Sequence, residues 1–173
     1  MVNFSPDKNA SEKKESSFVK GQKITVEHKD GSVSEHQVIN VLDSAKIASI
    51  IGINHQIKNP VPVLILDKMI PGGTAQYHPE LGVIFAYDNT KPEVMHHEII
   101  HSLEMPKTIP NDLEVFYAKV LNEIPDTSNL QPNFHKNIHE FVADAYSKPG
   151  FINNLKEHGL YQEFELLTKY IFE

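Results

Sequence analysis

The chain contains no cysteine among its 173 residues. This absence excludes a disulfide scaffold, a thiol nucleophile and any metal or iron–sulfur site with cysteine ligands. A metal site in this chain must therefore use histidine and carboxylate side chains. Histidine is plentiful, with ten copies, which directs attention to metal binding and to acid–base chemistry.

The chain also lacks a surplus of basic residues. It has 16 Lys and Arg against 23 Asp and Glu, a formal net charge of −7. A chain of this charge is a poor candidate for general binding to nucleic acid, because no basic surplus is available to neutralise phosphates. We therefore expect no nucleic-acid partner.

Long hydrophobic runs are missing as well. The longest apolar stretch, Val61 to Leu66, has the length of a strand, so we expect no membrane span. The N-terminal segment is polar and lacks the apolar middle region of a secretory signal peptide. The default expectation is a monomer in the cytoplasm.

The composition is that of a globular protein, with 40% hydrophobic and 23% charged residues. Residues 1–17 are rich in Ser, Lys, Asn and Glu, and we interpret them as a flexible tail. Residues 18–173 have the length of one domain. Within it, strand patterns come first and helix patterns later, an order that predicts an α+β fold.

The expected elements follow from the periodicity of the apolar residues and from turn signals. An alternating pattern around Asp30-Gly31 predicts a β-hairpin, and two apolar runs predict further strands. The predicted strands are 23–28, 32–39, 61–66 and 81–87, and the predicted helices are 42–53, 90–104, 113–124, 137–148, 151–158 and 161–172.

The most informative segment is His97-Glu98-Ile99-Ile100-His101, an HExxH motif. Two histidines four positions apart lie on one face of a helix, where both can bind one Zn²⁺. Glu98 lies beside the first histidine and can take a proton from a water molecule that the metal activates. The pattern predicts a zinc hydrolase with Glu98 as the general base.

The surrounding residues support a helix at the motif. Thr90 and Glu93 form a capping-box pattern, and Pro92 lies in the predicted first turn. The helix directly follows the strand predicted at 82–87. A strand followed by an HExxH helix resembles zincin-like folds, in which a peptide substrate adds along this strand; the other interpretation is a plain core strand.

Zinc needs a third protein ligand, and residues 102–133 contain no histidine. Further along, Glu140 and Asp144 are again four apart on a predicted helix. Such a pair can supply one metal ligand and one acceptor for the far N–H of a ligand histidine. His135 and His139 are alternative ligands, and a solvated helix face is the non-functional interpretation of the carboxylate pair.

HExxH followed about forty residues later by Glu140-Phe141-Val142-Ala143-Asp144 resembles gluzincin-type metallopeptidases. The most similar families are the anthrax lethal factor catalytic domain and the Pro-Pro endopeptidases, together with metallopeptidase domains in large polyvalent proteins of phages. The resemblance covers roughly residues 60–160. It implies a zincin-like fold, in which a small, mostly antiparallel N-terminal sheet and the HExxH helix precede a helical C-terminal half.

The resemblance also implies roles for individual residues. It makes His97, His101 and Glu140 the zinc ligands, Glu98 the general base and Asp144 the acceptor beside a ligand histidine. Those families carry a tyrosine shortly before the third ligand to stabilise the oxyanion, and this chain has none there. His139 is the expected substitute, and His135, Tyr117 and Tyr146 are the alternatives.

The predicted function is thus a zinc endopeptidase that binds one Zn²⁺ per chain and hydrolyses a peptide or protein substrate. The alternative is a non-catalytic binding or interaction module with the same fold, from a phage or mobile-element protein. The intact Glu98 favours the enzyme, because a decayed site has no use for the base. An amidase-like or DNA-associated metallopeptidase is a third interpretation, and the acidic net charge disfavours the DNA association.

Overall fold

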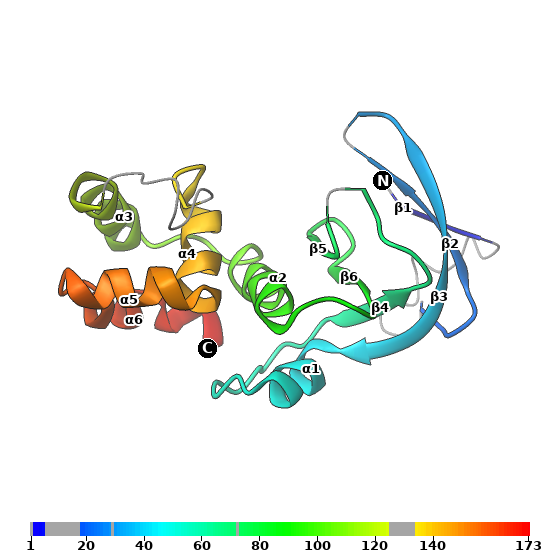
Figure 1. Cartoon of the computed structure of the whole chain (residues 1–173), viewed down its shortest axis with the longest axis horizontal. Helices are drawn as coiled ribbons and strands as arrows, with labels where there is room; N and C mark the ends of the chain where they lie inside the picture. Colours follow the sequence, from blue (N-terminus) through cyan, green and yellow to red (C-terminus); the bar gives the residue numbers. More distant parts are fainter. Residues whose placement is uncertain (1, 6–17, 29, 72, 125–133) are drawn as a thin grey trace.

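The computed structural model describes residues 2–5, 18–28, 30–71, 73–124 and 134–173 (Figure 1). It is a mixed fold in which a curled sheet lies to one side, a bundle of short helices lies to the other, and α2 runs between them. The predicted α+β class is confirmed. The strands are β1 Val2–Ser5, β2 Lys23–Glu27, β3 Val33–Asp43, β4 Pro62–Leu66, β5 Ala75–His78 and β6 Val83–Tyr87.

The helices follow the predicted order along the chain. Their bounds are α1 Ser44–Ile51, α2 Pro92–Glu104, α3 Asn111–Glu123, α4 Ile138–Ser147, α5 Pro149–Glu157 and α6 Tyr161–Thr168, with a final 3₁₀ turn η2 at Lys169–Phe172. In the described part of the chain, every helix is too short or too polar to cross a lipid bilayer.

The strand order is β1-β2-β3-β4-β6-β5. All neighbouring strands are antiparallel except β4 and β6, which run parallel. The predicted tail is wrong for Val2–Ser5, which pair with β2 as strand β1. The rest of that prediction, at residues 6–17, lies outside the described residues.

Strand β5 was not among the predicted strands, although it forms the edge of the described sheet nearest to α2. Its residues alternate between the core and solvent, with Ala75 and Tyr77 buried and Gln76 exposed. The interpretation of 82–87 as the strand that receives the substrate is wrong. That strand, β6, is paired on both sides, with β4 and with β5.

Helix α2 begins one residue later than the capping-box pattern predicts, because that pattern makes Thr90 the N-cap. Lys91 is its N-cap and makes no side-chain capping bond, while Pro92 occupies the first turn. The hydroxyl of Thr90 instead lies 2.8 Å from the carbonyl oxygen of Thr74 and 2.7 Å from that of Tyr87. Thr90 therefore closes the turn between β6 and α2 and is unavailable as a cap.

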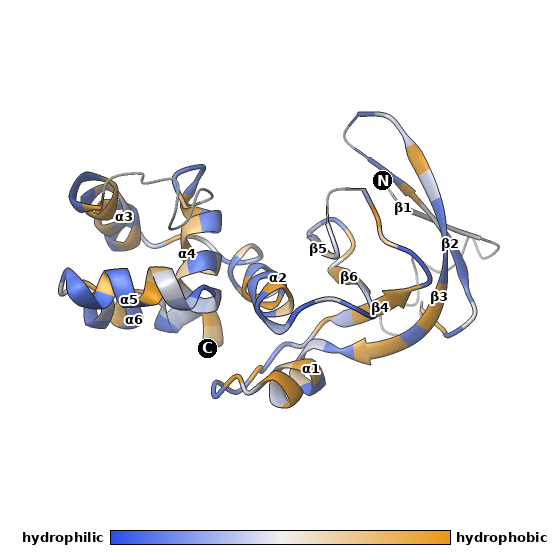
Figure 2. Ribbon diagram, in the orientation of Figure 1, coloured by the Kyte–Doolittle hydropathy of each residue, from blue (hydrophilic) through white to orange (hydrophobic). Residues whose placement is uncertain are grey.

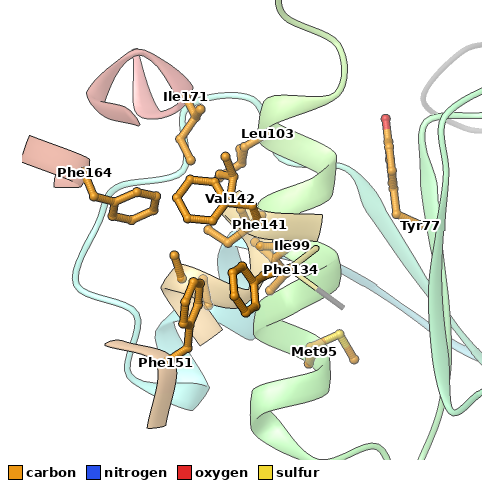
Figure 3. Close-up of a cluster of buried hydrophobic side chains, with 14 of the residues drawn as sticks. Tyr77, Met95, Ile99, Leu103, Phe134, Phe141, Val142, Phe151, Phe164 and Ile171 are labelled. Carbon is orange, nitrogen blue, oxygen red and sulfur yellow. The ribbon is translucent and has the colours of Figure 1, made fainter. Parts of the chain in front are cut away.

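The main hydrophobic core lies around α2, and Figure 3 shows its side chains. Met95, Ile99 and Leu103 are spaced four apart and bury one face of the helix. Phenylalanine rings from α4, α5 and α6 pack together in this core: Phe141, Phe151 and Phe164. The hydropathy colouring in Figure 2 shows the apolar segments of these helices alternating with polar ones. This packing holds α4 along α2 and brings their polar side chains together.

Candidate metal centre

Three side chains from two helices, each of a type that can bind a metal ion, converge between α2 and α4. His97 and His101 lie one turn apart on α2, and their Nε2 atoms are 3.1 Å apart. From α4, Oε1 of Glu140 lies 3.4 Å from Nε2 of His97, and its Oε2 lies 2.7 Å from Nε2 of His101. Two donors bound tetrahedrally about 2.0 Å from one zinc lie about 3.3 Å apart. The three groups therefore have a spacing close to that of zinc ligands.

Glu98 completes a compact group on α2. The ligand atoms of His97, Glu98 and His101 all lie within 4.8 Å of one another, so this group could hold a metal ion. Oε2 of Glu98 lies 3.8 Å from Nε2 of His97. The two oxygens of Glu140 lie closer to the imidazole nitrogens, at 3.4 and 2.7 Å. Glu98 is thus beside the three converging groups and at their edge.

A buried carboxylate lies beside Nδ1 of each imidazole, the ring nitrogen that points away from the converging Nε2 atoms. Oδ1 of Asp144, from α4, lies 3.0 Å from Nδ1 of His97, and Asp144 is 0% exposed. Neither oxygen makes a hydrogen bond in the described part of the chain, so Asp144 contacts His97 as an ion pair. A carboxylate facing Nδ1 favours the tautomer with the proton on that nitrogen and leaves Nε2 for a metal. This is the position that the resemblance implies for Asp144.

The matching partner of His101 is Glu104, which the sequence analysis missed. Oε2 of Glu104 lies 3.0 Å from Nδ1 of His101, and Glu104 is 1% exposed. The other oxygen, Oε1, lies 2.5 Å from Nδ1 of His139. His101 and Glu104 are three positions apart on one helix, and this spacing could have predicted their contact from the sequence.

Glu98 is oriented by the backbone of the edge strand. The N–H of Tyr77 in β5 donates to Oε1 of Glu98 at 2.7 Å. Burial raises the pKa of Glu98, an effect opposed by His101, by this N–H and by His97. A carboxyl group with a raised pKa is suited to take and release a proton near neutral pH. Tyr77 itself is buried, which fixes the position of this N–H beside Glu98.

Burial and the neighbouring carboxylates have opposite effects on the pKa of each histidine. Burial alone lowers the pKa of each, but the carboxylates of Asp144 and Glu140 raise the pKa of His97 to about 9. Glu104 and Glu140 likewise raise the pKa of His101 to about 10. Hydrogen bonds from both imidazoles hold the pKa of Glu140 far below its usual range. The site is therefore built to hold positive charge, which a divalent cation would also supply.

The predicted site residues come together from separate parts of the sequence. His97, Glu98 and His101 share one face of α2, while Glu140 and Asp144 reach them from α4. His139 contacts Glu104 through Nδ1 and is not among the groups around the two Nε2 atoms.

The two tyrosines among the alternative oxyanion donors make hydrogen bonds elsewhere, whereas the buried Nε2 of His135 has no hydrogen-bond partner in the described part of the chain. The hydroxyl of Tyr117 donates to the carbonyl oxygen of Phe134 at 2.7 Å. Tyr146 shares a hydrogen bond of 2.6 Å with the hydroxyl of Thr168. The ring of His135 packs beside that of Phe134, with 4.0 Å between their centroids. His139 differs from these alternatives because it contacts Glu104, which in turn contacts His101.

Comparison with known proteins adds no relative to this picture: no protein-family model, curated protein or solved structure matches the chain. The chemistry of the site must therefore be inferred from its own residues.

Proposed function

We propose that the protein is a zinc-dependent endopeptidase with a zincin-like fold. The observation that carries this proposal is the convergence of His97 Nε2, His101 Nε2 and Glu140 at 2.7–3.4 Å. Two imidazoles and one carboxylate are a ligand set that suits Zn²⁺ and leaves a fourth position for water or substrate. The carboxylates behind both imidazoles support the same interpretation, because they direct Nε2 toward the ion.

A zinc ion held there would polarise a substrate carbonyl and lower the pKa of a nearby water molecule. Glu98 would take the proton from this water molecule. The N–H of Tyr77 occupies its Oε1, so Oε2, on the side of His97, is the oxygen that accepts the proton and later delivers it to the leaving amine. The raised pKa of Glu98, caused by burial, favours both halves of this exchange.

The position of β5 supports an extended peptide as the substrate. In an antiparallel strand, alternate residues direct their N–H and C=O groups away from the neighbouring strand. The N–H of Tyr77 points to Glu98, so the backbone of Ala75 faces the same outer side. A peptide pairing with this edge would pass directly beside Glu98.

His139 is the proposed donor to the developing oxyanion. Its Nδ1 faces Glu104, and its side chain is 33% exposed, so Nε2 is the nitrogen left for a substrate. This assignment would fill the role for which the chain has no tyrosine before Glu140.

The test is zinc content and peptide cleavage, measured on the same preparations. We expect one zinc per wild-type chain and cleavage of at least one member of a peptide library. Glu98→Ala should keep the zinc and lose cleavage, because Glu98 handles the proton and is not a ligand. His97→Ala and His101→Ala should lose both.

Glu114→Ala, an exposed change on α3, is the matched control and should alter neither. Zinc binding without any cleavage by the wild type would favour the alternative, a non-catalytic module. Cleavage that survives Glu98→Ala would contradict the proposed mechanism.

A further inference from the structure

Glu104 is an unusual carboxylate because both of its oxygens contact imidazoles. It lies at the last turn of α2 with 1% of its surface exposed. Oε2 is 3.0 Å from Nδ1 of His101, on the same helix. Oε1 is 2.5 Å from Nδ1 of His139, at the first turn of α4. A carboxylate accepts hydrogen bonds only, so each of these nitrogens must donate an N–H.

This arrangement determines which nitrogen of each ring remains available. Without a metal, Nε2 of His101 also carries a proton, because Glu140 accepts it at 2.7 Å. A bound metal ion would take the place of that proton, while Nδ1 keeps its N–H on Glu104. His139 is turned in the same way, and its Nε2 is the nitrogen that stays away from the carboxylate. A single buried group thus constrains two rings that lie 38 positions apart along the chain.

We propose that Glu104 is a positioning residue that holds His101 and His139 at the same time, presenting Nε2 of the first to the metal and Nε2 of the second to the substrate. This inference rests on the proposed metal site for the role of His101. It goes beyond that site because it links a ligand on α2 to a proposed oxyanion donor on α4 through one side chain.

The isosteric change Glu104→Gln separates the two contacts. A glutamine offers one oxygen acceptor and one NH₂ donor group, so it can accept an N–H from only one of the two rings. The other ring must adopt the opposite tautomer or turn away. We expect zinc affinity to fall by about 10–100-fold, the typical effect of removing a partner of a ligand histidine.

The measurements are zinc affinity with a competing chelator and the protonation of Nδ1 in both rings of the metal-free protein, read from long-range ¹H–¹⁵N NMR spectra. In the wild type, Nδ1 of both His101 and His139 should carry a proton. In Glu104→Gln, the signals of His139 should change as well as the zinc affinity. Glu93→Gln is the matched control, because Glu93 is an exposed residue of the same helix, and it should change neither.

Unchanged zinc affinity in Glu104→Gln would overturn the proposal, as would unchanged His139 signals. If Glu104→Gln does not fold, the wild-type spectrum alone tests the proposal. An Nε2–H tautomer at His139 would contradict the contact between Glu104 and Nδ1 of His139. The NMR measurement uses no metal, so a chain that fails to bind zinc would refute the proposed function and leave this test intact.

Discussion

Replacing Asp144 by asparagine should weaken zinc binding without removing it. The carboxylate of Asp144 is fully buried, and its Oδ1 lies 3.0 Å from Nδ1 of His97 as an ion pair. Neither oxygen makes a hydrogen bond within the described region. Asparagine keeps the shape but loses the negative charge, and with it the attraction between the carboxylate and the imidazole. We expect zinc affinity to fall by about 10–100-fold, or about 1.4–2.7 kcal/mol.

Glu140→Ala should have the larger effect. It removes one of three proposed ligands, so the loss of affinity should exceed about 100-fold. Both variants are titrated with zinc against a competing chelator, beside Asp112→Asn as a control for an exposed aspartate on α3. A larger loss for Asp144→Asn than for Glu140→Ala would make Asp144 the ligand. Equal and negligible losses would remove α4 from the site.

Two further predictions concern stability. The folded-state pKa values of His97 and His101, about 9 and about 10, lie above the ordinary value of 6.5, so their contribution to stability is full below pH 6.5 and is lost as pH rises toward 10. Thermal melts of the metal-free chain should therefore show a falling Tm across this range, and a rising Tm would contradict the charge assignment. Phe141→Ala should lower the free energy of unfolding by about 3–5 kcal/mol, because its buried ring fills the contact between α4 and the neighbouring helices. Denaturant unfolding measures this, and a loss below about 1 kcal/mol would refute that packing role.

The parts of the site that depend on helical spacing could be predicted from the sequence. Residues four apart on a helix share a face in any fold, which is why His97 and His101 point the same way. The same rule places Glu140 and Asp144 together. That the two helices meet could be inferred only from the resemblance, because no local pattern determines how helices pack.

Other contacts have no signal in a single sequence. The bond from the Tyr77 N–H to Glu98 uses the backbone, which any residue except proline could supply. Strand β5 is only four residues long, too short for its alternation to stand out. The contact between Glu104 and His139 joins positions 35 residues apart, so it emerges only once α2 and α4 are packed together.

The most direct test of the metal centre is a crystal structure of the zinc-loaded chain with anomalous data collected at the zinc absorption edge. We predict one anomalous peak per chain, within bonding distance of His97 Nε2, His101 Nε2 and a carboxylate oxygen of Glu140. A peak bound by His135 or His139 in place of Glu140, or no peak between α2 and α4, would contradict the proposed zinc site.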